Sequence, residues 1–472
     1  MNTHQPQQRR KSTVWLVAIM GTASLMLLTL LLPRTVDHGR RRPNGEMSVI
    51  YHEDMSANRT RSVSPPMARP KPAATPEETV AEKVSQFGRS RREITYGLAR
   101  KHGVEVSAEV ERFFDAVQAG NWEQIEALFT SLQRQHQAKP SVQEVDAVWP
   151  AILDAFGAAE AGHDWPAKKL LEYGNAIMGT LRPDMVYVGG TDPGRWIPAL
   201  MNTSEGEQHI VITQNGLADS KYLEYVQFLY GDRFGALDPE EATAAQKEYL
   251  RDARKRLEHD QQFPDEPRQV RPGEDVRITT EKLQQGFADG DIQAAGQTSI
   301  MAVNEILLNK LLQKNPDLSF ALEESFPMKS VNAEASPIGP IMELRAEGEN
   351  ALTQERAAQA VEYWRDETKR LMADPEFKDS DYAKKSYSKL VSSQGGVLVQ
   401  HGFLAEAEEA FRYANELCPY SPEAVFRYVS LLVDQNRIDE AARVVSDASK
   451  SDPKSDQFRD LAAQLGKRKT SY

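Results

Sequence analysis

The sequence has very little cysteine, because Cys418 is the only one among 472 residues. A single thiol cannot form an internal disulfide, so packing and hydrogen bonds must hold the fold together. Clusters of cysteine and histidine with the spacing of a zinc site are also missing, and we expect no metal centre. The lack of disulfides leaves the cellular compartment open, since many exported bacterial domains have none.

An excess of positive charge is absent as well. The formal net charge is −12 at pH 7, and the isoelectric point is about 5.4. An acidic surface repels phosphate backbones, so we do not expect nucleic acid as a partner of this chain.

The motifs that identify common catalytic and nucleotide-binding sites are missing too. The chain has no G-x-x-x-x-G-K-[ST] loop, no G-x-G-x-x-G fingerprint, no G-x-S-x-G elbow and no H-E-x-x-H pair. His163 and His209 are isolated, and such histidines are usually structural. Motifs therefore identify neither catalytic residues nor a cofactor.

The clearest feature that is present is an apolar run near the amino terminus. Residues 14–32, VWLVAIMGTASLMLLTLLL, carry no charged side chain. A helix of this length crosses the roughly 30 Å hydrocarbon core of a bilayer. No A-x-A cleavage site follows the run, so we interpret it as an uncleaved transmembrane anchor rather than a signal peptide. The lipid bilayer is therefore an expected partner of residues 14–32.

Basic residues lie on both sides of this run, at residues 9–11 and 40–42. The positive-inside rule consequently gives almost no orientation. Because a short tail before a single anchor usually stays in the cytoplasm, we expect the rest of the chain on the extracytoplasmic side of a bacterial inner membrane. Residues 40–42 either contact anionic lipid head groups or only fix the topology.

Composition and hydrophobic periodicity divide the chain into successive parts. The expected parts are a basic tail (1–13), the anchor (14–32), a disordered linker rich in Arg, Pro and Ser (33–78), a helical segment (79–144), an α/β domain (145–346), a helical connection or degenerate repeat unit (347–387), two repeat units (388–421 and 422–455) and a capping helix with a tail (456–472). The expected fold is thus mixed: an anchor helix, helices, an α/β domain and a helical carboxyl-terminal region.

The helical segment at 79–144 is predicted to contain a helical hairpin. One apolar stripe runs from Val110 to Val117 and a second from Ile125 to Leu132, and Gly120 with Asn121 separates them. These stripes indicate packing and suggest no chemistry.

The segment from 145 to 346 alternates helical and strand patterns. Residues 166–181 are typical of a helix, whereas MVYVGG (185–190) and HIVITQ (209–214) are typical of buried strands. Residues 238–262 are highly charged and predict an exposed helix. The alternation favours a parallel or mixed sheet covered by helices.

The carboxyl-terminal part repeats itself with a period of 34 residues. Small or apolar residues recur at this offset, as do two prolines: Ala407 and Ala441, Phe411 and Val445, Ala414 and Ala448, Pro419 and Pro453. Small residues at fixed places let the two helices of a hairpin approach closely, and proline ends the second helix. This period and pattern resemble the tetratricopeptide repeat family. The resemblance implies helical hairpins that bind protein partners in a concave groove. Two or three units are too few to form a long groove, so an alternative is that they pack against the α/β domain instead of binding a partner.

Three polar loops follow predicted strands of the α/β domain. They are GGTDPGR (189–195), QNGLADS (214–220) and EESFP (323–327). If these strands are parallel, the loops meet at the carboxyl edge of one sheet, where open α/β sheets bind ligands. The candidate ligand-binding residues are Gly189, Gly190, Asp192, Arg195, Asn215, Asp219, Glu323 and Glu324.

The residues of these loops suit the binding of an anion or a cation, and acid–base chemistry. The glycines permit close approach of the backbone to a ligand, and Arg195 offers a planar fork for carboxylate or phosphate. The four carboxylates suit a hard cation or acid–base work. Each residue also has a structural explanation: Asp192 before Pro193 starts a helix, and Asp219 is a good helix cap. Pro198 argues against one continuous helix after Trp196.

The middle segment has a resemblance of its own. YVGGTDPGRWIPALMN, ITQNGLADSKYLEYVQFLYG and NPDLSFALEESFP resemble segments of large bacterial envelope proteins of uncharacterised function. They are also similar to the soluble domain of polytopic proteins assigned to protein O-glycosylation. There a Gly-Asp-Asn-Asp turn follows a strand, and only Gly190 and Asp192 match it here. This resemblance implies an accessory domain detached from the multi-pass transferase.

Two functional hypotheses follow. The first is a membrane-anchored scaffold or accessory protein whose repeats bind protein partners. The second is an enzyme or small-ligand receptor, for example for a sugar phosphate, that uses the carboxyl edge of the α/β domain. A structural envelope spacer is a third, weaker reading.

Overall fold

The computed structural model describes residues 74–190, 192–206, 208–279, 287–323, 329–344 and 352–469. The predicted anchor at 14–32 and nearly all of the predicted linker lie outside the described residues. Within these ranges, no helix is long and apolar enough to cross a membrane. We call residues 74–344 the body and residues 352–469 the helical region.

The body begins with helices joined by short turns. They are α2 (Pro76–His102), α3 (Ala108–Ala119), α4 (Trp122–Gln137), α5 (Gln143–Asp146), α6 (Trp149–Asp164) and α7 (Ala167–Met178). Gly120 adopts a left-handed φ of 67° between α3 and α4, which only glycine does easily. Phe113 and Leu132 are fully buried, so the two apolar stripes face the core as their spacing indicates.

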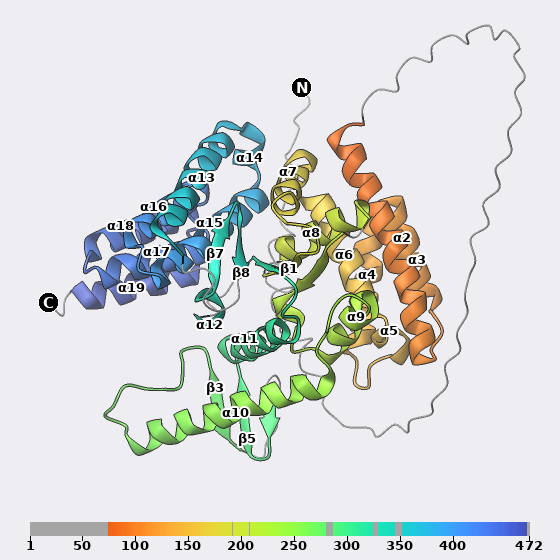
Figure 1. Ribbon diagram of the computed structural model, residues 1–472, viewed down its shortest axis with the longest axis horizontal. Helices are drawn as coiled ribbons and strands as arrows, with labels where there is room; N and C mark the ends of the chain where they lie inside the picture. Colours follow the sequence, from red (N-terminus) through yellow and green to blue (C-terminus); the bar gives the residue numbers. More distant parts are fainter. Residues whose placement is uncertain are drawn as a thin grey trace, which may run out of the picture.

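A five-stranded mixed sheet forms the centre of the body (Figure 1). Its strands are β1 (Val186–Gly189), β2 (Ile210–Thr213), β6 (Phe320–Leu322), β7 (Ala335–Ile338) and β8 (Ile341–Leu344). The order is β2-β1-β6-β8-β7. The strands β2, β1 and β6 run parallel, whereas β8 is antiparallel to β6 and β7 is antiparallel to β8. The three strands that precede the polar loops therefore share one carboxyl edge.

Tyrosines close the outer edge of this sheet at β2. Tyr222 and Tyr230 belong to α9 (Ser220–Tyr230). The backbone N–H of Thr213 donates to the Tyr222 hydroxyl at 2.8 Å, and that of Val211 donates to the Tyr230 hydroxyl at 3.4 Å. Free edge N–H groups invite pairing with another chain, and these hydroxyls occupy them.

The prediction that Pro198 prevents one continuous helix after Trp196 is wrong. Helix α8 runs without a break from Asp192 to Ser204 and contains Pro198. Proline lacks the N–H that would bond the carbonyl of Gly194 four residues earlier. The Tyr187 hydroxyl on β1 donates to that carbonyl at 2.7 Å instead. A partner from the sheet thus satisfies the carbonyl and lets the helix continue.

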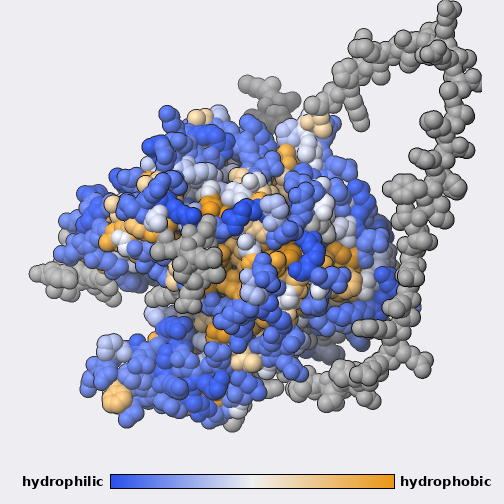
Figure 2. Space-filling model, viewed as in Figure 1, coloured by the Kyte–Doolittle hydropathy of each residue, from blue (hydrophilic) through white to orange (hydrophobic). Residues whose placement is uncertain are grey.

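A second, smaller sheet was not expected from the sequence. It is antiparallel, in the order β3-β5-β4. Its strands are β3 (Asp275–Ile278), β4 (Phe287–Asp289) and β5 (Ile292–Ala295), and it lies beside α10 (Pro239–Gln262) and α11 (Gln297–Lys314). Figure 1 shows this part projecting from the body along α10, and Figure 2 shows that it is almost entirely hydrophilic in that view.

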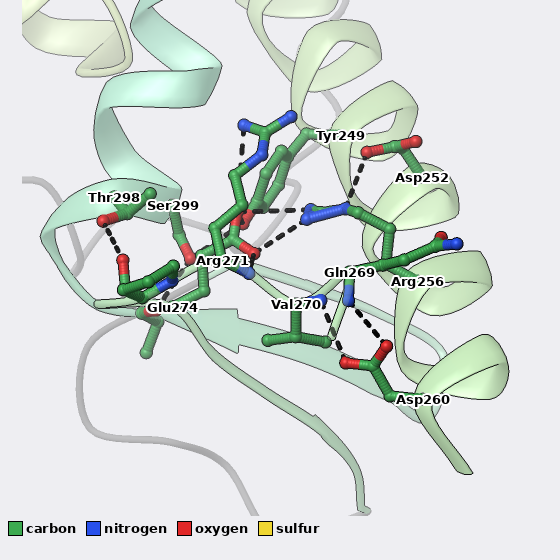
Figure 3. Close-up of polar contacts among 12 residues, drawn as sticks. Tyr249, Asp252, Arg256, Asp260, Gln269, Val270, Arg271, Glu274, Thr298 and Ser299 are labelled. Atoms are coloured by element: carbon green, nitrogen blue, oxygen red, sulfur yellow. Dashed lines mark hydrogen bonds and ion pairs between the residues drawn. The ribbon is translucent and has the colours of Figure 1, made fainter. Parts of the chain in front are cut away.

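A buried ion pair holds the small sheet against α10 (Figure 3). Arg256 on α10 donates to both carboxylate oxygens of Glu274, at 2.7 and 3.2 Å. The Tyr249 hydroxyl lies 3.0 Å from Glu274 Oε1 and 2.8 Å from Ser299 Oγ. The backbone N–H of Arg271 donates to Glu274 as well. Several donors thus compensate a carboxylate that has lost contact with solvent.

The helical region consists of hairpins. Its helices are α13 (Gln354–Ala373), α14 (Pro375–Asp379), α15 (Asp381–Gln400), α16 (Leu404–Leu417), α17 (Pro422–Asp434), α18 (Ile438–Ser451) and α19 (Asp456–Lys469). The small and apolar residues at the 34-residue offset lie in the core, where Ala407 and Ala441 are fully buried, whereas Pro453 is exposed. A Cβ on Gly395 would lie 2.6 Å from the ring of Phe411, so the close approach of α15 and α16 requires glycine there.

Candidate functional site

The three polar loops meet at the carboxyl edge of the five-stranded sheet. The backbone N–H of Glu323 continues the β6 ladder and donates to Val188 O at 2.9 Å. Glu323 Oε2 accepts from the backbone N–H of Gly190 at 2.9 Å. Asn215 Nδ2 donates to Gly190 O at 2.9 Å. The structure therefore brings Gly190, Asn215 and Glu323 together, with Gly189 at the end of β1.

Glu323 occupies the position that an anion would take at this loop. Its side chain lies against the first turn of α8, where a Cβ on Gly194 would collide with its carboxylate. The Tyr173 hydroxyl on α7 donates to Glu323 Oε1 at 3.2 Å. Only 2% of Glu323 is exposed. A helix start attracts negative charge, and here a carboxylate of the same chain supplies it.

Arg195 points away from the loop and into the core. Its Nη2 lies 2.6 Å from Asp154 Oδ1 on α6. The Tyr225 hydroxyl donates to the other oxygen of Asp154 at 2.7 Å, and Arg91 Nε lies 3.6 Å from that oxygen. The guanidinium also lies 5.3 Å from the centre of the Tyr222 ring. Arg195 thus joins α8 to α6 and α9.

Asp192, at the start of α8, interacts electrostatically with Glu323 and with Glu160 on α6. Burial raises the pKa of Asp192, although Arg195 and Lys389 oppose the effect. Burial, followed by the charges of Asp164 and Asp192, raises the pKa of Glu160 to about 8. Glu160 therefore holds its proton at neutral pH.

Asp219 serves as a helix cap. Its Oδ1 accepts from the backbone N–H of Lys221 at 2.9 Å, at the start of α9. Burial raises its pKa to about 6, opposed by that hydrogen bond and by His136. No contact joins it to Glu323 among the interactions that the structure describes. Glu324 lies outside the described residues.

Helix α15 of the helical region lies near this edge. Lys389 on α15 pairs with Glu423 on α17 at 3.0 Å. Burial lowers the pKa of Lys389, but Glu423 and then Glu323 and Asp192 outweigh this, so the pKa is raised. The ammonium is therefore electrostatically coupled to the strand edge. The carboxyl edge of the sheet and the repeat region, which the sequence predicted as separate candidate sites, therefore lie next to each other.

Sequence reasoning missed several residues of this arrangement. Glu160 and Asp164 are four residues apart, so helical periodicity could have placed them on one face of α6. Tyr173, Asp154 and Lys389 gave no sequence signal, because their roles depend on contacts between distant elements. Within the described ranges, no group of three or more His, Cys, Asp or Glu side chains could hold a metal ion.

Comparison with known proteins identifies the helical region only. Residues 398–465 match the family model described as tetratricopeptide repeat. The match runs from the end of α15 into α19 and includes the predicted unit at 422–455. No curated protein and no solved structure matches the chain. The resemblance of the middle segment to envelope and glycosylation proteins therefore receives no support. Tetratricopeptide repeats generally mediate protein–protein interactions.

Proposed function

We propose that this chain is a protein-interaction component that binds its partner through the helical region, at the open face of α17. The observation that carries the proposal is the repeat match at 398–465 together with an exposed aromatic side chain on that face. Phe426 is 39% exposed. An exposed aromatic residue among polar neighbours is typical of binding surfaces.

The exposed Phe426 lies beside two contacts that join α17 to α15. Glu423 pairs with Lys389, and Arg427 donates to Ser392 O at 2.9 Å. Phe426 lies between Glu423 and Arg427 in the sequence, so it projects near the same side of the helix. Ser430, one turn further, is also exposed. The proposed binding surface therefore consists of Glu423, Phe426, Arg427 and Ser430, the residues of this stretch that are at least partly exposed, which we call the α17 face.

Affinity capture with point variants tests this proposal. The full chain, Phe426→Ser and Phe263→Ser are each used to capture proteins from the cells that make the chain. Phe263, at the end of α10, is exposed to a similar extent, 42%. We expect Phe426→Ser to lose a partner that the other two retain. Identical captured sets from all three proteins would contradict the proposal.

We also propose that residues 14–32 attach the chain to a membrane and that residues 33–78 act as the spacer. The support is the uncharged run of membrane-spanning length. Deletion of residues 14–32 tests it: the full chain stays with membranes after an alkaline wash, and the deletion variant is released. A reporter fused to the carboxyl terminus then determines which side the body faces, which we propose is extracytoplasmic.

The alternative function, binding of a sugar phosphate at the strand edge, has weaker support. Glu323 occupies the Gly190 N–H, and Arg195 is paired with Asp154. The groups that would recognise a phosphate thus already have partners within the chain.

A further inference from the structure

We propose that the body is a releasable cover on α15, so that the helical region exists in a covered and an uncovered state. The inference goes beyond the proposed partner binding, and both states can be detected without any partner. It predicts that a partner needing α15 as well as the α17 face must first displace the body.

Helix α15 is in contact with the body. Tyr387, Leu390, Val391 and Gln394 of this helix are almost completely buried. Gln394 Nε2 donates to Gly339 O at 2.9 Å and to Ile341 O at 3.0 Å, which places α15 against the β7–β8 turn. The body therefore contacts one side of α15, while α13, α14 and α16 of the helical region cover other sides through Trp364, Phe377 and Phe411.

The contact between the body and the helical region includes ion pairs. Lys169 on α7 pairs with Asp374 at the start of α14 and lies 2.8 Å from Glu172. Arg370 on α13 reaches the same Glu172 at 3.1 Å. A perpendicular ring contact of 5.3 Å between Tyr173 and Tyr387 adds an apolar element. Charged contacts between parts of one chain are typical of interfaces that open.

Lys169 also reports the covered state directly. It is fully buried, whereas its neighbour Lys168 is 55% exposed. Separation of the body from α13 and α14 would expose Lys169 to an amine reagent. Cys418, the only cysteine, is fully buried inside the helical region. Its thiol reacts only if that region itself unfolds, so the two groups distinguish release from unfolding.

The experiment is acetylation of the full chain, read by mass spectrometry at each lysine. Wild type is labelled at low salt and at about 1 M NaCl, which weakens the partly exposed pair of Arg370 with Glu172 more than the buried pairs of Lys169. Arg370→Gln, which removes the contact with Glu172 of the body, is labelled at low salt, and Arg365→Gln is the matched control. Arg365 lies on α13 and pairs only with Glu362 and Asp366 on its own helix among the described ion pairs.

We expect labelling of Lys169, relative to Lys168, to rise by up to about fivefold in Arg370→Gln, which is the equivalent of one exposed ion pair. In high salt we expect a smaller rise, because buried pairs are screened less. Arg365→Gln stays at the wild-type level, and a thiol reagent leaves Cys418 unmodified throughout. Lys169 that stays unlabelled in both the salt and the variant arms overturns the proposal. Lys169 and Cys418 becoming reactive together also overturns it, because the helical region would then be unfolding. Neither result depends on a partner, so failure here is distinct from failure of the proposed binding at Phe426.

Discussion

Glu323 accepts a hydrogen bond from the backbone N–H of Gly190 across 2.9 Å and 133 residues of sequence. This contact determines how the GGTDPGR loop must be interpreted. The loop has the form of an anion-binding turn at a helix start, and the anion that it holds is a side chain of the next parallel strand. The strand edge is therefore completed from within the chain.

Replacement of Glu323 tests this interpretation. We expect Glu323→Ala to lower the free energy of unfolding by about 2–4 kcal/mol, since it leaves a buried N–H and the Tyr173 hydroxyl without their acceptor. Acetate or phosphate should stabilise this variant against heat and leave wild type unchanged, because the anion position is then vacant. Equal stabilisation of both proteins by phosphate would show instead that the edge accepts an external anion beside Glu323.

The pairing of Tyr187 with Pro198 gives a second prediction. Tyr187→Phe removes the donor to the Gly194 carbonyl, and we expect a loss of about 1–2 kcal/mol in urea unfolding. Pro198→Ala restores a helix N–H to that carbonyl. In the Pro198→Ala background, Tyr187→Phe should therefore cost clearly less. Equal costs in the two backgrounds would mean that the hydroxyl does not substitute for the missing N–H.

Glu160 predicts a dependence of stability on pH. Its pKa of about 8 in the folded chain exceeds the ordinary value of 4.5. The folded state therefore holds the proton more tightly, so this contribution is complete below the ordinary pKa and is lost as the pH rises through about 8. Between about pH 6 and pH 9, wild type should lose about 2–3 kcal/mol more than Glu160→Gln, which cannot ionise. Parallel stability curves for the two proteins would refute the assignment.

The ion pair in Figure 3 predicts a large local effect. Glu274→Ala leaves the buried Arg256 with only the exposed carboxylate of Asp252. We expect a cost of about 3 kcal/mol, at the lower end for a broken buried pair, with faster amide exchange in 239–279 and 287–295. The control is Asp291→Ala, which breaks an exposed pair with Arg254 in the same part of the chain. It should cost no more than about 1 kcal/mol. Similar costs for the two variants would count against a structural role for the Glu274 network.

Local repetition made the helical region predictable. Ala407 and Ala441 occupy equivalent places because each hairpin meets the same packing requirement. The strands β1, β2 and β6 were predictable because each is an apolar run followed by a polar turn. Because parallel strands end at the same edge of a sheet, the sequence also predicted that Gly190, Asn215 and Glu323 lie close together.

The remainder depended on contacts that no local pattern encodes. Arg195 was expected to face a ligand, and its actual partner Asp154 lies 41 positions away. The strands β3, β4 and β5 have only three or four residues each, too few for alternation to stand out from the surrounding polar sequence. Helix α8 continued through Pro198 because of a hydroxyl from another element.

The most direct test of the central claim, that the α17 face binds a protein partner, is photo-crosslinking in living cells. A photoreactive phenylalanine analogue is placed at position 426 in the full chain and, as the matched control, at position 263, where the native phenylalanine is similarly exposed. We predict a discrete covalent adduct with another protein from position 426 and none of that size from position 263. Absence of an adduct at 426, or the same adducts from both positions, would contradict the claim.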